Sequence, residues 1–138
     1  MSMLQGRDIL ARLGAGGENR SSMYGVPADL DLSPVVGEFT TQIRVGQFDL
    51  QFTFGSVNFA VQSPVSVLRD GTVLARWAQG SWPEPGFFDV LNASVLAVTI
   101  GPKEIALGLE NGLTLQLIDD SDQYETMQIN AGDGLWVI

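Results

Sequence analysis

From Phe39 onward, apolar and polar residues alternate along the chain. A period of two is typical of strands that bury one face, so this region is expected to form a β structure. Gly55–Ser56 is a turn signal between two such runs, and the runs on either side of it are expected to pair as a hairpin. The apolar positions are Phe48, Leu50, Phe52 and Phe54 before the turn, and Val57, Phe59 and Val61 after it.

A second pair of alternating runs lies in the C-terminal part of the chain, around Asn111–Gly112. Asn-Gly is a strong hairpin signal because both turn positions need a positive φ. The apolar positions repeat those of the first pair at a spacing of 55 residues before the turn and 56 after it: Ile105, Leu107 and Leu109, then Leu113, Leu115 and Leu117. The spacing predicts two similar hairpins. It leaves open whether they arose by duplication, since any two amphipathic hairpins share such spacing.

The remaining segments favour short strands separated by breaks. Ser63–Pro64 ends regular pairing, and Pro83 and Pro85 interrupt the chain between the two hairpins. Val95–Ile100 reads as a further strand, and the last strand is expected at Leu135–Ile138. The predicted fold is mainly β with a minor α component: two similar halves that form a barrel-like or two-sheet structure.

The first residues follow a different pattern. Leu4, Ile9, Leu10 and Leu13 have the spacing of one helix face, so a short helix is expected over 1–14. Residues 15–38 are rich in Gly, Ser and Pro, which predicts an irregular connector. With 138 residues, the chain is expected to be a single domain, residues 1–138, whose β-rich body covers 39–138.

Composition limits the compartment and the partners. The chain has no cysteine, which fits a reducing compartment, and it has neither a signal-peptide pattern nor an apolar run of about 20 residues. We therefore expect a soluble, cytoplasmic protein of bacterial type. The net charge is −9, and residues 104–138 contain seven acids and no base. An acidic surface disfavours nucleic acid and anionic membranes, and it favours a basic protein partner or simple solubility.

The missing residue types exclude many mechanisms. Without His or Cys, neither a Ser–His or Cys–His nucleophile nor a His-ligated or thiolate metal site can be built. The only lysine, Lys103, follows Pro102 in a predicted turn, which offers no shielded position for Schiff-base chemistry. No catalytic residue, metal ligand or cofactor is predicted.

The densest group of acids is the segment DDSDQYE, which follows a predicted strand directly. A solvated turn is the simplest interpretation, and a calcium loop or a pair of catalytic carboxylates are the alternatives. For calcium, the loop glycine is missing and Ala131 stands at the twelfth position, where a ligating acid is needed. The candidate binding residues in this segment are Asp119, Asp120, Asp122, Tyr124 and Glu125.

The three tryptophans have different contexts. Trp77 and Trp136 lie on predicted strands and are expected in the core. Trp82 stands among Gly and Pro in GSWPEPG, where it either lies over the core or is exposed as an aromatic anchor of an interface. It is therefore the sixth candidate binding residue.

The runs FDLQFTFGSVNFAVQSPVSVLRDGT and ENGLTLQLIDDSDQYETMQI resemble small bacterial β-rich proteins of unassigned function, over residues 40–130. These proteins carry a Tyr-Glu-Ser-Trp-like C-terminal motif. Tyr124 and Glu125 match its first two positions, Thr126 stands for the Ser, and Met127 replaces the Trp. Relatives are similar to proteins encoded near toxin–immunity systems, so the resemblance implies an immunity-type or other binding protein.

Two hypotheses about function follow. The first is a non-catalytic binding protein, of immunity type, whose acidic surface meets a basic partner. The second is a self-assembling structural protein, in which the strand Leu135–Ile138 or another unpaired edge joins a second copy into a homodimer. A calcium-binding protein or a carboxylate enzyme is the remaining alternative.

Overall fold

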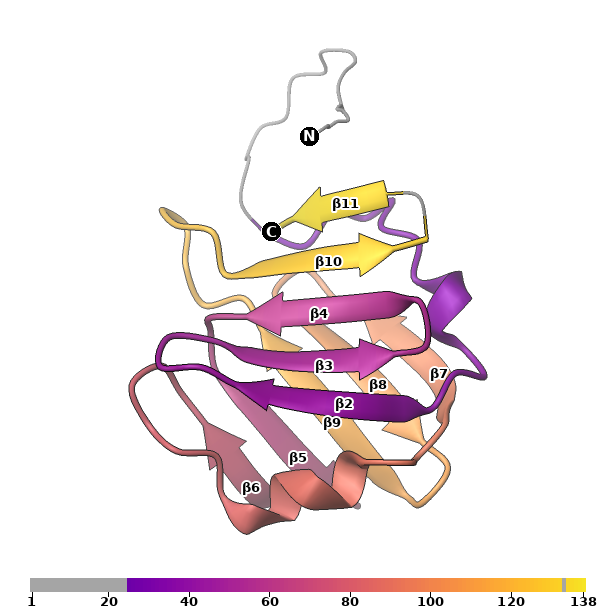
Figure 1. Ribbon diagram of the computed structural model, residues 1–138. Coiled ribbons are helices and arrows are strands. Elements are labelled where there is room, and N and C mark those ends of the chain that lie inside the picture. Colours follow the sequence, from indigo (N-terminus) through magenta and orange to yellow (C-terminus); the bar gives the residue numbers. More distant parts are fainter. Residues whose placement is uncertain (1–24, 133) are drawn as a thin grey trace.

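The computed structural model describes residues 25–132 and 134–138. The helix expected over 1–14 and the connector up to residue 24 lie outside these residues. In the described part, two antiparallel five-stranded sheets pack face to face (Figure 1). This confirms the prediction of a mainly β, two-sheet fold, and the sheets do not close into a barrel. No helix in the described ranges has the length and apolar character needed to cross a membrane.

Each sheet contains strands from both parts of the chain. The first sheet has the order β11-β10-β4-β3-β2, and the second has the order β6-β5-β9-β8-β7. The strands of the first sheet are β2 (Thr40–Val45), β3 (Leu50–Phe54), β4 (Val57–Val61), β10 (Met127–Ala131) and β11 (Gly134–Val137). The strands of the second are β5 (Val65–Arg69), β6 (Thr72–Trp77), β7 (Val95–Ile100), β8 (Glu104–Leu109) and β9 (Leu113–Ile118).

The core lies between the sheets and is formed by the alternating positions that the sequence predicts. In β3, β4, β8 and β9, every second residue is buried. Phe54 and Phe59 meet edge to face with ring centroids 5.8 Å apart. Complete burial of one such apolar side chain contributes about 1.5–3 kcal/mol, so these strands supply much of the driving force for folding.

Phe48 is an exception to the predicted alternation. It was expected on the buried face with Leu50, but its side chain is 58% exposed. The strand begins at Leu50, and Phe48 lies in the turn after β2, where its carbonyl oxygen accepts a hydrogen bond from Gln79 Nε2. The alternation of apolar and polar residues thus extends beyond the N-terminal end of β3 by one apolar residue, Phe48.

The two halves of the described chain have the same order of elements. In the first half (residues 33–77), the 3-10 turn η1 (Ser33–Val35) precedes β2, β3 and β4, which stay in one sheet, and then the β5–β6 hairpin crosses to the other. In the second half (residues 85–138), the 3-10 turn η2 (Pro85–Val90) precedes β7, β8 and β9, and the β10–β11 hairpin crosses back. The predicted similarity of the two halves is confirmed, and it extends to five strands each.

The halves meet about an approximate two-fold axis. Phe39 pairs with Ser94, which is its own counterpart 55 residues later. The Gly37 N–H donates to the Val95 oxygen (2.8 Å), and the counterpart bond runs from the Asn92 N–H to the Thr40 oxygen (2.9 Å). Both Gly37 (φ +91°) and Asn92 (φ +67°) have a left-handed backbone, a conformation that Gly and Asn accept most readily.

Candidate functional site

The two halves differ most in the crossover that links their third and fourth strands. Two equivalent hydrogen bonds frame the crossovers, from Gln62 N–H to the Thr126 oxygen (2.7 Å) and from Ile118 N–H to the Pro64 oxygen (3.1 Å). In the first half, only Ser63 lies between the framing residues. In the second half, the segment Asp119–Glu125 lies there, and we name it the acidic loop. It contains five of the six candidate binding residues.

Asp119 is buried, which corrects the expectation of a fully solvated turn. Its residue exposure is 1%. The reason is visible in β9, where Leu113, Leu115 and Leu117 point inward, so the alternation places the next odd-numbered residue inside as well. Ser63 continues the inward positions of β4 in the same way and is 3% exposed. A carboxylate therefore occupies the place that a serine holds in the first half.

Hydrogen bonds fix Asp119 at the base of the acidic loop. Its backbone N–H donates to the Lys103 oxygen (2.8 Å), and its Oδ1 accepts a hydrogen bond from Thr126 Oγ1 (2.9 Å). Thr126 is also buried, and its Oγ1 lies 3.2 Å from the Ile138 oxygen. Among the described residues, Asp119 Oδ2 and Ser63 Oγ are buried without a partner. Asp119 thus supports the loop from within and is not available to bind at the surface.

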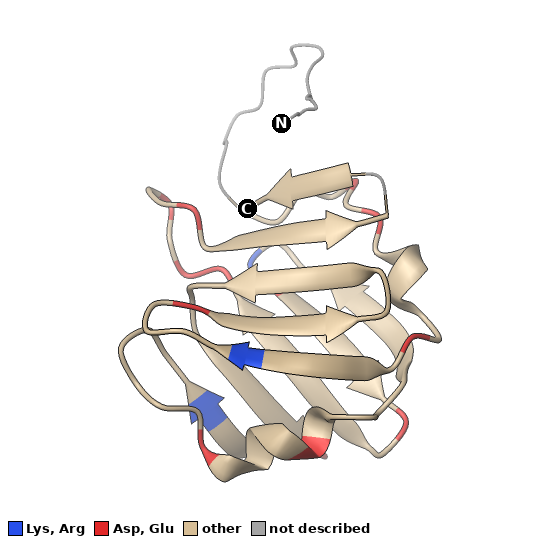
Figure 2. Ribbon diagram, in the orientation of Figure 1, with Lys and Arg blue, Asp and Glu red and all other residues tan. Residues whose placement is uncertain are grey.

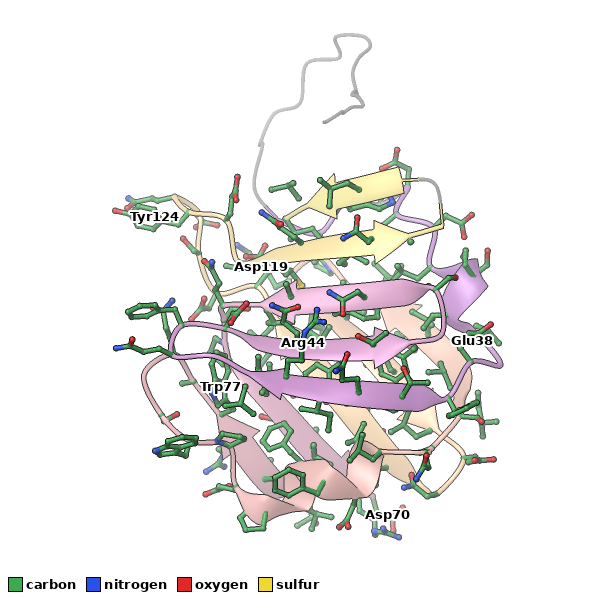
Figure 3. The ribbon with its side chains drawn as sticks, viewed as in Figure 1. Glu38, Arg44, Asp70, Trp77, Asp119 and Tyr124 are labelled. Atoms are coloured by element: carbon green, nitrogen blue, oxygen red, sulfur yellow. The ribbon has the colours of Figure 1, made fainter. Side chains whose placement is uncertain are left out.

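The rest of the acidic loop projects from the body of the protein. Asp120, Asp122 and Glu125 are exposed, and the Tyr124 side chain is 71% exposed (Figure 3). Ser121 Oγ accepts hydrogen bonds from the N–H groups of Gln123 (3.0 Å) and Tyr124 (2.9 Å), which orders the tip. An ordered turn thus presents an exposed aromatic ring beside three exposed carboxylates.

Lys103 links the acidic loop to the turn between β7 and β8. Its ammonium group donates to Asp122 Oδ1, and the two side chains are 55% and 82% exposed. The hydrogen bond to Asp122 raises the pKa of Lys103 above the ordinary lysine value. The contact neutralises one acid of the loop but leaves Asp120 and Glu125 without a cationic partner in the described part of the chain. Figure 2 shows that few positions along the described chain are Lys or Arg.

The acids do not converge on a common point. Within residues 25–132 and 134–138, no three Asp or Glu side chains are grouped so that they could hold a metal ion. The acidic loop therefore presents the exposed side chains of Asp120, Asp122, Tyr124 and Glu125 to solvent.

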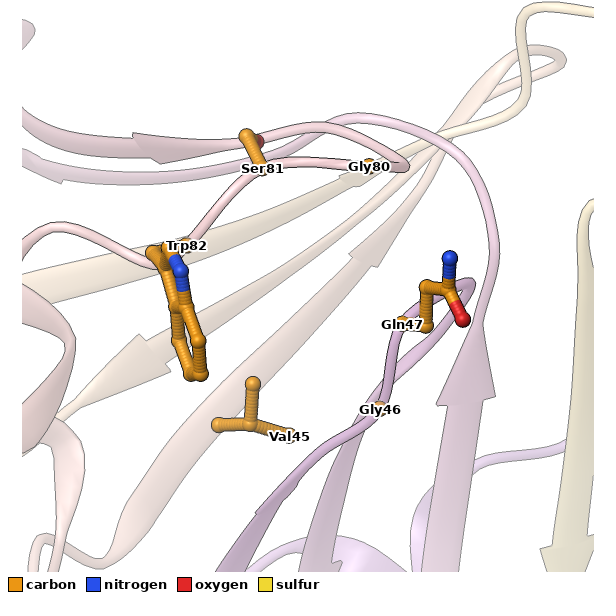
Figure 4. Close-up of a pocket in the computed structure, with 6 residues that line it drawn as sticks. All are labelled: Val45, Gly46, Gln47, Gly80, Ser81 and Trp82. Atoms are coloured by element: carbon orange, nitrogen blue, oxygen red, sulfur yellow. The ribbon is translucent and has the colours of Figure 1, made fainter.

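Trp82 lies apart from the acidic loop, in the segment between β6 and η2, and it is 84% exposed. It lines a groove of about 290 Å³ together with Val45, Gly46, Gln47, Gly80 and Ser81 (Figure 4). The backbone hydrogen bond from Gly80 N–H to the Gln47 oxygen (3.2 Å) joins two of the lining residues. At the counterpart position, Val26 N–H donates to the Pro102 oxygen (3.0 Å), and Val26 is buried there.

Sequence reasoning overlooked two buried polar residues, Ser63 and Thr126, although a signal for one of them was present. Ser63 follows Val57, Phe59 and Val61 at the same spacing of two, so it continues the buried face. Thr126 has no such signal, because its burial depends on the hydrogen bonds that join the crossover to Ile138. Trp77 is 2% exposed, as expected of a core residue, and Trp136 is partly buried against the core.

Comparisons with known proteins add no functional assignment: no family model, curated protein or solved structure matches this chain. The site is therefore interpreted from its own geometry.

Proposed function

We propose that this protein is a non-catalytic binding protein of immunity type, which docks a basic surface of a partner protein through the acidic loop. The observation that carries the proposal is the extra length of the second crossover. Where the first half has Ser63 alone between the framing residues, the second half presents Tyr124 at 71% exposure among exposed carboxylates.

The chemistry of the loop supports a protein partner. An exposed tyrosine supplies a large contact area at a small entropy cost, and aromatic residues are enriched among the residues that dominate binding energy. Carboxylates around it accelerate encounter with a basic surface and select against acidic partners. The resemblance to proteins encoded near toxin–immunity systems agrees with this role. A cytoplasmic location agrees with the absence of cysteine.

The test compares three immobilised baits in a lysate of the producing bacterium. The first is the wild type, and the second is the loop variant Asp120→Asn, Asp122→Asn, Glu125→Gln, which keeps the buried Asp119. The third is a control with the same change of charge on turns and η2 elsewhere in the fold: Asp70→Asn, Asp89→Asn, Glu110→Gln. A specific partner is a protein that the wild type and the control retain and the loop variant loses.

The captured partner is then titrated against each variant. We expect the loop variant to weaken binding at least about ten-fold at low salt, with a smaller difference at high salt because exposed charges are screened. Tyr124→Ala is expected to weaken binding about thirty-fold or more, the effect of losing a central aromatic contact. Retention of the same proteins with the same affinity by all baits would refute the proposal.

A further inference from the structure

Along the outer edge of β11, backbone groups have no hydrogen-bond partner among the described residues. In the β10–β11 pair, Ile138 and Met127 exchange both of their N–H···O bonds (2.9 and 3.1 Å). Because hydrogen-bonding alternates along an antiparallel strand, Leu135 and Val137 direct their N–H and C=O groups away from β10. Neither residue makes a backbone bond to another described residue on that side. Figure 1 shows β11 at the end of the first sheet.

The side chains along this edge are apolar and partly exposed. Leu135 is 42% exposed and Val137 is 40% exposed. The register with β10 is regular over its whole length, without a bulge. The segment 134–138 contains no charged side chain, although the chain as a whole has a net charge of −9. A regular, uncharged and apolar edge is the kind of edge that accepts another strand.

The counterpart edge in the first half, β6, is protected in three ways. Arg76 stands at the place of Val137, so the edge carries a charge. The Arg76 N–H donates to Glu84 Oε1 (2.8 Å), and this carboxylate therefore occupies a backbone group that a new strand would need. The pairing of β5 with β6 also contains a register shift between Val67 and Leu68. Charge, a covering group and a bulge are the usual devices that prevent edge-to-edge association.

We propose that β11 is an association edge, at which two copies of this chain join by antiparallel strand addition about a two-fold axis. The axis passes beside Trp136, so that Leu135 of one copy lies opposite Val137 of the other, and these residues exchange their hydrogen bonds. The first sheets of the two copies then form one continuous sheet.

A second copy fits this edge better than a charged peptide does. Each copy contributes an uncharged strand, so the joint places apolar side chains opposite apolar side chains, at a distance where such pairs stabilise a sheet. Antiparallel pairing of equivalent segments already joins the two halves within the molecule, at Phe39 and Ser94. Within residues 25–132 and 134–138, no group caps the edge of β11 in the way that Glu84 caps the edge of β6.

Sedimentation equilibrium of the full chain up to about 1 mM tests the dimer. We expect a monomer–dimer equilibrium that is strengthened by salt, because each copy has a net charge of −9 and salt screens their mutual repulsion. Leu135→Lys is expected to weaken the dimer at least ten-fold. The matched control is Leu74→Lys on β6, where the leucine is 46% exposed, and this variant is expected to dimerise as the wild type does.

Single-cysteine variants test the register. The chain has no cysteine, so Leu135→Cys and Val137→Cys each introduce one thiol. In the proposed register the two positions lie opposite each other, with Cα atoms about 5.5 Å apart, which is within disulfide range. A mixture of the two variants should form a disulfide-linked heterodimer faster than either variant forms a homodimer. Circular dichroism melts of each variant check that it is folded.

Three results would overturn the proposal: a monomer at every concentration, a dimer that Leu135→Lys leaves intact, or equal cross-linking in the mixture and in the separate variants. The acidic-loop variant separates this inference from the proposed function. It should dimerise at least as strongly as the wild type, since its substitutions lie outside β11 and only reduce the repulsion between the two negatively charged copies.

Discussion

The two halves of this protein share a framework and differ at its margins. Their strands follow in the same order, and equivalent residues pair where the halves meet. The crossovers differ, because Ser63 alone stands where the other half has the acidic loop. The outer strands also differ, because Glu84 caps a backbone group of β6 and no described residue does so for β11. The comparison teaches that the two halves bury the same positions of their strands, whereas the surfaces that can meet a partner differ between them.

The largest effect should come from removing equivalent core side chains. Phe52 and its counterpart Leu107 are both fully buried. We expect Phe52→Ala to lower the free energy of unfolding by about 3–5 kcal/mol and Leu107→Ala by about 2–5 kcal/mol, because each leaves a cavity. Urea unfolding followed by tryptophan fluorescence and by circular dichroism measures both. Two separate transitions in either variant would show that the halves do not share one cooperative core.

Removing a buried hydroxyl from the crossover should lower the free energy of unfolding by an intermediate amount in the second half only. Thr126→Val removes the hydroxyl that donates to Asp119, so a buried carboxylate loses its partner, and we expect a loss of about 1–3 kcal/mol. Ser63→Ala removes a hydroxyl that is buried without a partner in the described residues, and it is expected to be neutral or to stabilise by up to about 1 kcal/mol. Urea denaturation at pH 7 compares the two. Equal losses would contradict the contrast between the crossovers.

The smallest effect concerns the link from Lys103 to the acidic loop. The hydrogen bond to Asp122 raises the pKa of Lys103 above 10.5, so its stabilising effect is present below that pH and is lost as the pH rises through the higher value of the folded protein. Asp122→Asn should lower the pKa of Lys103, as measured by NMR titration. Both side chains are largely exposed, so the melting temperature at pH 7 should not change measurably. An unchanged lysine titration would mean that the pair is not formed in solution.

Much of the fold could be predicted from the sequence, because its hairpins are local. Alternation and turn residues identify β3–β4 and β8–β9, and they indicate that the halves are alike. Local patterns could not predict the exchange of hairpins, in which β5–β6 joins the sheet of the second half and β10–β11 joins the sheet of the first half. It depends on pairings such as Val61 with Met127 and Val65 with Leu117, between residues far apart in the chain.

The candidate site was predicted in position but not in detail. The sequence identifies the acidic segment, yet the role of Asp119 depends on where β9 ends and on a hydrogen bond to Thr126. For Trp82, the flanking Gly and Pro residues exclude a strand but do not decide whether the indole lies on the core or in solvent. Its exposure follows from the path of the chain between β6 and η2, which tertiary packing determines.

The exchange of hairpins also determines the order in which this protein can fold during synthesis. β4 and β5 pair with β10 and β9, which leave the ribosome much later. At about 5–20 residues per second, the inner edges of the first half remain without their partners for a time on the order of seconds. At this stage the nascent chain exposes the unpaired edges of β4 and β5, whose apolar residues are buried in the complete fold. It is then most prone to aggregate or to require a chaperone.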